Sequence, residues 1–385
     1  MRIYFITQTD FDINLDIATW KEMSEALVKK GCTVNLILPR FKSAANIYKG
    51  KTQITLLPCP RIRFFSFPCF QLSVFFYCLV SAIFGKYDLI IADSFTAITL
   101  VPLALLKKIG LLRLKIVLDI RSVPVDIYGL NGKIQEKRFN AAVWVAKWLF
   151  DGITVITNFY SKKISKDFDI NEKRIGIWTS GVAEEKFSPS IDSDIKKRFG
   201  ISDKFIVMYH GGIAFSRGID SLIYAIKALE NEIPDLILML IGKGNDDEIK
   251  SIIKNEGIEE RVIFPGSVPY EEIPAYIKAC DVGILPFPDS LWWRMSSPLK
   301  LFEYQAMEKP VILTNIESHR EAAKDGKFLF LIPSNSVKDI SDGIKKAYTM
   351  KDMLQALGQD GRKSILRNGT WEVQAQRLIN YLETI

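Results

Sequence analysis

The sequence predicts an α/β fold made of two doubly wound, Rossmann-like domains, each built on a parallel sheet. Short continuous apolar strands alternate with amphipathic helices along the chain, and turn-forming residues interrupt this alternation near its middle. Unbroken apolar strands are typical of parallel sheets that helices cover on both faces. The 385 residues suffice for two domains of ordinary size. The 48% hydrophobic and 25% charged residues exclude a disordered chain.

The first half opens with a strand over residues 2–7 and a helix over 19–30, whose apolar residues recur at helical spacing. Gly31 follows as a helix stop. Each later strand of this half is separated from the next by room for a helix. These strands are expected at 33–38, 88–92, 115–119 and 152–156.

The second half repeats the pattern. Its strands are expected at 205–209, 236–241, 261–264, 282–285, 311–314 and 328–332. Helical patterns between them cover 218–230, 247–256, 271–279 and 299–307. Turn and linker residues within 179–204 place the domain boundary, so we expect domains over 1–182 and 183–368.

The net charge of +7 is divided unevenly between the halves. Residues 1–180 carry 25 basic and 14 acidic residues, and residues 181–385 carry 26 and 30. The first half therefore has a net charge of +11, which indicates an anionic surface as its partner. The basic residues alternate with Phe and Leu and do not form a recognition helix, which disfavours nucleic acid.

Residues 64–84 contain no charged residue and are long enough to span a membrane. A span is disfavoured because the strands before and after it belong to one sheet, which would then lie on both sides of the bilayer. We expect a buried helix over 73–84. The alternative is an exposed Phe-rich start beside Arg61 and Arg63, which would anchor the domain on anionic lipid.

Five scattered cysteines without a CxxC pair or a Cys/His cluster disfavour both a disulfide scaffold and a zinc site. We expect a reducing, cytoplasmic location, with the protein peripheral on the inner face of the membrane if the anionic partner is lipid. No metal ion or cofactor is expected.

The strongest candidate site is a helix start at Ser297-Pro298. Ser297 is a natural N-cap and Pro298 suits the first helical position, so the free N–H groups of the first turn form an anion site beside Lys300. Glu303 follows about 4.5 Å along the same face and can accept hydrogen bonds from a vicinal diol. The ordinary alternative is a capped surface helix with an ion pair between Lys300 and Glu303.

A glycine-rich loop supplies the second candidate. His210 ends a strand, and Gly211 and Gly212 then allow a ligand to approach the backbone at the carboxyl edge of the sheet. Arg217, six residues after Gly211, can bind a diphosphate through two hydrogen bonds. His210 itself is equally well explained as a residue at the end of a strand whose imidazole forms hydrogen bonds with backbone groups.

The second half resembles the donor domain of the GT-B retaining glycosyltransferases, specifically glycosyltransferase family 4. The motifs that carry the resemblance are GGIAFSRG, LMLIGKG, RVIFPGSVPYEEIPAYIKACDVGILPF, SSPLKLFEYQAMEKPVIL and GTWEVQAQRLINYL. The first half resembles the acceptor domain more loosely, through KKGCTVNLI, KYDLIIADS, KIVLDIRSV and ITVITNFYS. The resemblance implies two Rossmann-like domains facing each other across a cleft, with a terminal helix over 369–385 that packs back on the first domain.

The resemblance also implies roles for single residues. Arg217 and Lys300 would hold the donor diphosphate and stabilise it as it leaves, without a metal ion, and Glu303 would bind the ribose hydroxyls. The remaining residues implied to bind the donor are Gly211, Gly212, Gly242, Ser267, Val268, Ser297 and Leu299.

Three positions depart from the family pattern. Met295 replaces the first glutamate of the family's pair, which contacts donor-sugar hydroxyls, and Gly212 replaces a basic residue of the loop. No histidine precedes residue 210, so imidazole catalysis in the first domain is excluded. In front-face retention a donor phosphate oxygen can take the acceptor proton. Asp126 is the alternative base, although a solvated loop acid explains it as well.

The implied activity is transfer of a sugar from a nucleotide-diphosphate sugar to a glycan or lipid-linked acceptor, in the synthesis of cell-surface polysaccharide or glycolipid. Two alternatives stay open: a catalytically silent partner subunit that binds a nucleotide sugar, and a nucleotide-sugar epimerase of the same architecture. We expect His319 to be a surface or loop residue. Trp292 and Trp293 are expected on a loop, where they stack on a sugar or simply pack.

Overall fold

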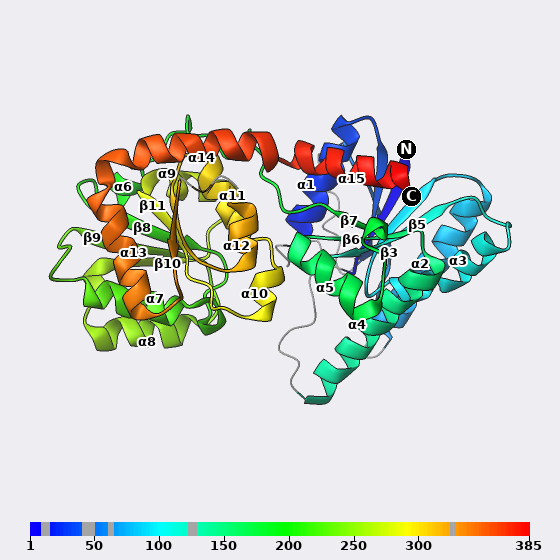
Figure 1. Ribbon diagram of the computed structural model, residues 1–385, viewed down its shortest axis with the longest axis horizontal. Helices are drawn as coiled ribbons and strands as arrows, with labels where there is room; N and C mark the ends of the chain where they lie inside the picture. Colours follow the sequence, from blue (N-terminus) through cyan, green and yellow to red (C-terminus); the bar gives the residue numbers. More distant parts are fainter. Residues whose placement is uncertain (9–15, 41–50, 61–64, 122–128, 324–325, 327) are drawn as a thin grey trace. The chain divides into compact units, whose positions relative to one another are not determined.

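The computed structural model describes residues 1–8, 16–40, 51–60, 65–121, 129–323, 326 and 328–385. Two compact units make up the chain (Figure 1). Unit 1 comprises Met1–Thr179 together with Trp371–Ile385, and unit 2 comprises Ser180–Thr370. The boundaries expected from the sequence, at 182/183 and 368/369, lie within three residues of these.

Unit 1 is built on a seven-stranded parallel sheet with the order β3-β2-β1-β4-β5-β6-β7. The strands are β1 Arg2–Ile6, β2 Thr33–Arg40, β3 Gln53–Pro58, β4 Leu89–Asp93, β5 Lys115–Ile120, β6 Gly152–Val155 and β7 Ile175–Ile177. The five strands expected from the sequence are present. The two edge strands β3 and β7 were not predicted, because β3 is only partly buried and β7 has three residues.

Helices cover both faces of this sheet, with α1 and α15 on one face and the helices from α2 to α5 on the other (Figure 1). They are α1 Asp16–Lys29, α2 Ser66–Ile83, α3 Val101–Lys108, α4 Gly129–Leu149, α5 Asn158–Phe168 and α15 Trp371–Thr384. Helix α15 is thus the terminal helix of the chain, and it packs on α1 and β7 of unit 1.

Two glycines make room for α15. The Tyr381 hydroxyl donates to the Arg174 carbonyl (2.5 Å) and accepts from the Ile153 N–H (3.1 Å). A Cβ at Gly152 or at Gly176 would overlap the Tyr381 side chain. The close approach of α15 to β6 and β7 therefore requires glycine at both positions.

The prediction of a buried helix over 73–84 was wrong. Helix α2 begins at Ser66, and only Phe70, Val74, Cys78 and Ser81 are buried. These four residues recur at a spacing of three or four, so a single narrow stripe of the helix packs on the unit while the rest faces outward. Residues 61–64, with Arg61 and Arg63, lie outside the described residues.

Unit 2 has a six-stranded parallel sheet with the order β10-β9-β8-β11-β12-β13. The strands are β8 Phe205–His210, β9 Leu236–Ile241, β10 Val262–Gly266, β11 Val282–Leu285, β12 Val311–Thr314 and β13 Leu329–Ile332. The helices are α6 Ile195–Arg198, α7 Ile219–Ala228, α8 Asp246–Glu256, α9 Ile273–Ala279, α10 Leu291–Met295, α11 Leu299–Ala306, α12 Glu317–Ala322, α13 Val337–Thr349 and α14 Leu354–Asn368. All six strands and four helices expected from the sequence are present.

The order of this sheet reverses between β8 and β11, because β9 and β10 extend to one side and β12 and β13 to the other. Open α/β sheets bind ligands at such a switch point, outside the carboxyl ends of the strands. We therefore expect a ligand-binding site at the loops that follow β8, β9 and β11.

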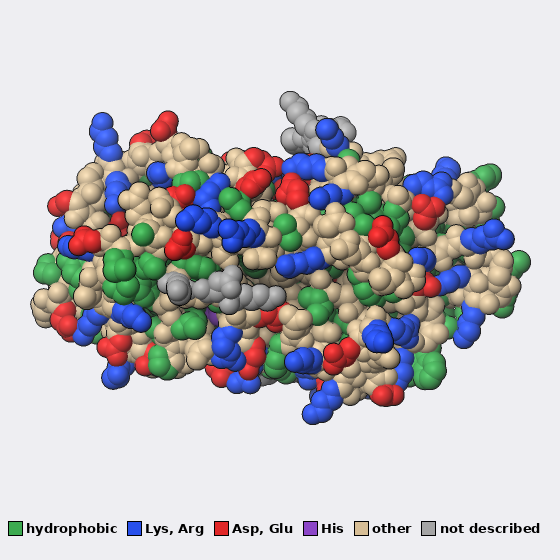
Figure 2. All heavy atoms as spheres, turned by 45° about the horizontal axis from the view of Figure 1, so that its top comes forward, with side chains coloured by type: hydrophobic (Ala, Val, Ile, Leu, Met, Phe, Trp, Pro, Cys, Tyr) green, Lys and Arg blue, Asp and Glu red, His purple; other side chains and the backbone are tan. Residues whose placement is uncertain are grey.

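On the face drawn in Figure 2, Lys and Arg side chains are interspersed with Asp and Glu over both units. The positive net charge of the first half does not gather into one patch on that face. A continuous basic stripe, which would indicate nucleic acid, is not seen there.

Candidate functional site

The candidate site lies at the carboxyl end of β8, where the glycine loop meets the first turn of α11. Gly211 has a φ of 111°, and a Cβ built on it would lie 2.6 Å from Lys300 Nζ. The Lys300 ammonium group therefore rests directly against the Gly211 backbone. Only glycine leaves it that space and adopts that backbone conformation without strain.

Lys300 is a half-buried cation without an anionic partner. In the part of the chain that the structure describes, it makes no ion pair and no hydrogen bond, and its Nζ lies 5.6 Å from the Tyr209 ring centroid. Burial, together with the charge of the neighbouring Arg217, lowers the pKa of Lys300 to about 7, although Glu303 acts in the opposite direction. An anion bound beside this ammonium group would offset both the burial of its charge and its repulsion from Arg217.

Arg217 is the second cation of the site. Its guanidinium carbon lies 5.0 Å from the Trp293 ring, and a Cβ on Gly212 would lie 3.1 Å from its Nε. The Trp293 indole N–H donates to the Ser216 carbonyl (2.8 Å), which ties α10 to the glycine loop. Arg217 also forms no ion pair with a described carboxylate. Two cations thus converge on one backbone loop with no negative charge between them.

The first turn of α11 differs by one residue from the prediction. The helix begins at Leu299, and Pro298 occupies the N-cap position without a side-chain cap. Ser297 is therefore not the N-cap. Its hydroxyl instead accepts from the Ser180 N–H (3.2 Å), and its carbonyl accepts from the Ser180 hydroxyl (2.8 Å). No side chain caps the N–H groups of the first turn, so they remain directed at the site.

Glu303 lies on α11, one turn beyond Lys300, and is 3% exposed. The Tyr270 hydroxyl donates to its Oε1 (2.8 Å), and His210 Nε2 lies 3.4 Å from its Oε2. Burial raises the pKa of Glu303 to about 7, against the effects of Tyr270 and Lys300. The simple ion pair with Lys300 that the sequence left open is not formed, and Tyr270 is a partner of Glu303 that sequence reasoning missed.

His210 is buried and stays neutral. Burial holds the pKa of its imidazole well below the ordinary value, with the charge of Lys300 adding to the effect. Its Nε2 has no hydrogen-bond partner among the described residues. His210 therefore faces Glu303 as an uncharged group, so the pair is not an ion pair at neutral pH.

The other residues expected to bind the donor fall on neighbouring loops. Gly242 follows β9, and a Cβ there would overlap the Gly211 carbonyl oxygen. Its N–H donates to the Gly266 carbonyl (2.9 Å), which joins it to the turn that contains Ser267 and Val268. That turn runs on to Tyr270 and so to Glu303. Asp126 lies outside the described residues, and the structure says nothing of its role.

One expectation about aromatic residues needs correction. Trp292 and Trp293 are not on a loop, because they belong to the short helix α10. Trp293 stacks on Phe287 (4.0 Å between ring centroids), and Trp292 packs against Trp293 edge to face. Met295 ends the same helix and is buried.

His319 is not a surface residue. It lies on α12 and is fully buried, with its Nδ1 2.7 Å from the Thr314 carbonyl. Burial lowers its pKa to about 4. Among the described residues, no group of three or more His, Cys, Asp or Glu side chains is arranged to hold a metal ion.

Comparison with known proteins shows which family the chain resembles. Residues 191–364 match the family model described as Glycosyl transferases group 1. A GDP-mannose-dependent alpha-(1-6)-phosphatidylinositol monomannoside mannosyltransferase of Mycolicibacterium smegmatis is 26% identical over 207 residues, which are 52% of this chain and 54% of that protein. A putative glycosyltransferase of Bacillus subtilis, EpsD, is 29% identical over 192 residues, or 49% of each chain. The chain spans about half the length of the curated relatives that it matches.

Solved structures resemble the whole chain. HepE of Anabaena in complex with UDP superposes with a TM-score of 0.78 at 16% identity, over 100% of both chains. Sucrose-phosphate synthase of Thermosynechococcus elongatus gives the same TM-score and identity, over 100% of this chain and 98% of the other. At such identities the likeness establishes the fold. Residues 191–364 therefore form a Glycosyl transferases group 1 domain, and the chain as a whole has the GT-B fold and resembles glycosyltransferase family 4.

Proposed function

We propose that the chain is a glycosyltransferase that takes its sugar from a nucleotide-diphosphate donor bound to unit 2. One observation carries the proposal: Lys300 and Arg217 converge on the Gly211–Gly212 backbone, and neither has an anionic partner among the described residues. A half-buried cation is costly unless an anion compensates it. A diphosphate supplies that charge, and the uncapped first turn of α11 adds N–H donors.

Different residues of the site would bind different parts of the donor. Lys300 and Arg217 would neutralise the diphosphate, most strongly as negative charge develops on it during departure. Glu303, already oriented by Tyr270, would accept hydrogen bonds from the ribose hydroxyls. Gly211, Gly242 and the Ser267–Val268 turn would let backbone groups approach the nucleotide.

We further infer that transfer proceeds with retention and without a metal ion. In this proposal Lys300 and Arg217 would stabilise the leaving diphosphate, the role that a divalent ion has in other enzymes. In a front-face attack, the bond between the sugar and the donor diphosphate breaks as the acceptor oxygen forms the new glycosidic bond on the same face. An oxygen of the departing diphosphate takes the proton of the acceptor hydroxyl. Asp126 is the alternative acceptor of that proton.

The proposed acceptor is a glycan or a lipid-linked saccharide in the synthesis of cell-surface polysaccharide or glycolipid. Two relatives support this class by name, one that acts on a phosphatidylinositol monomannoside and one assigned to teichuronic acid synthesis. We place the enzyme in the cytoplasm at the inner surface of the membrane, where such acceptors are made.

A donor screen tests the proposal. The full chain is offered UDP-, GDP- and TDP-sugars, and binding and nucleotide release are measured. We expect one donor class to bind and turn over, and Lys300→Met to lower turnover by about 10²–10³-fold, the loss typical of one charge-stabilising donor. Lys338→Met, which removes an exposed lysine of unit 2, is the control and should change nothing. Failure of every donor to bind would overturn the proposal.

A catalytically silent partner subunit is the second candidate. Met295 and Gly212 favour it, because a family glutamate and a family basic residue are missing at those positions. Such a subunit would bind a donor in the same screen without releasing nucleotide, even when candidate acceptors are added.

A further inference from the structure

The outer face of three helices in unit 1 is unusually apolar. Of 22 large apolar residues that are exposed in the described part of the chain, 15 lie between residues 65 and 148, and unit 2 contributes only six. The 15 residues are Phe65, Phe67, Leu72, Phe76, Val80, Ile83, Phe84, Phe95, Ile98, Leu105, Ile109, Leu111, Ile134, Trp144 and Trp148. We call this surface the α2–α4 face. Nine of these residues lie within α2, α3 and α4, and six lie in the segments next to them. Soluble proteins rarely leave large apolar surfaces in water unless they bind something.

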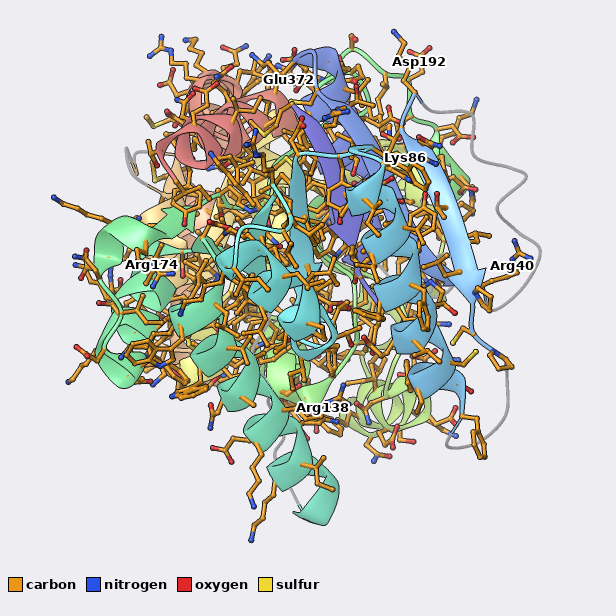
Figure 3. The ribbon with its side chains drawn as sticks, turned by 90° about the vertical axis from the view of Figure 1, so that its right-hand side faces the viewer. Arg40, Lys86, Arg138, Arg174, Asp192 and Glu372 are labelled. Carbon is orange, nitrogen blue, oxygen red and sulfur yellow. The ribbon has the colours of Figure 1, made fainter. Side chains whose placement is uncertain are left out.

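The helices that carry this face are joined to one another. The Gln71 amide of α2 donates to the Phe95 carbonyl (3.3 Å) and its carbonyl oxygen accepts from the Thr99 hydroxyl. The Arg138 guanidinium of α4 lies 5.5 Å from the Phe95 ring. Helix α3 packs against α4. Figure 3 looks onto this layer, with Lys86 beyond the end of α2 and Arg138 on α4 labelled. The 15 residues thus belong to one layer of the unit.

Helix α2 lies on the unit and does not cross a bilayer. Among the described residues it is the one helix long and apolar enough to span a membrane. However, β3 precedes it and β4 follows it, and both strands belong to the same seven-stranded sheet. A spanning helix would place these strands on opposite sides of the bilayer. The helix can therefore enter a membrane only sideways, with its buried stripe still on the sheet.

The charges on these helices are almost all of one sign. Helices α2, α3 and α4 carry six basic residues and one acidic residue, Glu136. The basic residues are Lys107, Lys108, Lys133, Lys137, Arg138 and Lys147. Two of them have acidic partners just outside the helices: Lys107 pairs with Asp151, and Lys147 pairs with Asp169 (3.2 Å). Trp144 and Trp148 of α4 are 61% and 58% exposed, and the Lys147 Nζ lies 5.4 Å from the Trp148 ring centroid. Exposed tryptophan beside lysine is typical of the boundary between lipid headgroups and acyl chains.

We propose that the α2–α4 face docks on the surface of an anionic bilayer. The Phe, Leu, Val and Ile side chains of α2 enter the acyl boundary, the tryptophans of α4 lie at headgroup depth, and the basic residues meet lipid phosphates. The basic residues still outnumber Glu136, Asp151 and Asp169 by six to three, which favours lipid over a second copy of the chain, because two such faces would repel each other.

Vesicle sedimentation tests the docking with the full chain. We expect binding to vesicles of phosphatidylcholine mixed with phosphatidylglycerol, weaker binding at high salt, and little binding to phosphatidylcholine alone. The double variant Phe76→Glu/Ile83→Glu changes two exposed side chains of α2 and should lower the bound fraction at least about tenfold. The matched control Leu331→Glu/Met353→Glu changes two exposed apolar residues of unit 2 and should bind as the native chain does.

Three results would overturn the proposal: no vesicle binding by the native chain, equal loss in both double variants, or a lipid-independent dimer that the α2 variant dissolves. A second variant, Trp144→Ala/Trp148→Ala, tests the same face if the Phe76→Glu/Ile83→Glu chain does not fold, and it should also bind vesicles more weakly. Donor binding by unit 2 is measured on every variant. Because vesicle binding needs no turnover, its failure would leave the proposed sugar transfer standing, and failure of transfer would leave the docking standing.

Discussion

The titration of Lys300 should make donor affinity depend on pH. Its pKa of about 7 lies far below the ordinary value because of burial and Arg217. A bound diphosphate favours the ammonium form, so binding above pH 7 requires the uptake of a proton. Donor affinity should therefore fall by up to about tenfold per pH unit above 7. Isothermal titration with the donor found in the screen checks this between pH 7 and 9.

The variant Lys300→Arg and the two pH ranges separate the contributions of Lys300 and Glu303 to this profile. Lys300→Arg keeps the charge without titrating, so its affinity should stay level over the same range. Below pH 7 the opposite slope is expected from Glu303, because protonation of its carboxylate removes an acceptor for the ribose. His210 stays neutral and adds no slope. A native profile that is flat above pH 7 would contradict the role of Lys300.

Tyr270 positions the ribose-binding carboxylate. Tyr270→Phe removes the 2.8 Å hydrogen bond to Glu303 and should raise the pKa of Glu303 further, because that bond favours the ionised form. We expect about tenfold weaker donor binding, the effect of one hydrogen bond to a charged group. The loss should be larger at pH 6 than at pH 8. An equal loss at both values would indicate that Tyr270 contributes only packing against Phe187.

At the scale of elements, the glycine loops decide how closely β8 and β9 approach at their carboxyl ends. Gly242 has a φ of 147°, and a Cβ there would overlap the Gly211 carbonyl. Gly242→Ala should lower the free energy of unfolding by about 3 kcal/mol, from backbone strain and overlap together. Urea denaturation measures it. The control is Gly257→Ala, at a φ of 63° with open space around it, which should cost about 1 kcal/mol.

Element by element, the sequence pattern predicted most of both sheets and the helices α7, α8, α9 and α11 of unit 2, but not α13 or α14. It missed β3 and β7, because edge strands are short or half-buried and lack a continuous apolar run. It also placed α2 in the core. Apolar composition predicts a helix over these residues, but it does not reveal whether a neighbouring element covers each side, and here only one stripe is covered.

For the whole molecule, two units with separate sheets predict two unfolding transitions. Donor at 100 times its dissociation constant should stabilise unit 2 by about 2.7 kcal/mol and leave the transition of unit 1 in place. Anionic vesicles should shift the unfolding transition of unit 1. Differential scanning calorimetry checks both, with Lys300→Met as the variant that no longer responds to donor. One transition that moves as a whole would contradict this independence.

The sequence by itself determined the two-domain α/β fold and the cationic site, because strand periodicity, glycine loops and a helix start are local properties of the chain. The residues of the site come from two such segments, which the ends of the neighbouring strands β8 and β11 bring together. These residues are Gly211, Gly212, Arg217, Lys300 and Glu303. Only the tertiary structure paired Tyr270 with Glu303, buried His319 and exposed α2. Burial and hydrogen bonding depend on residues distant in sequence, which no local pattern specifies.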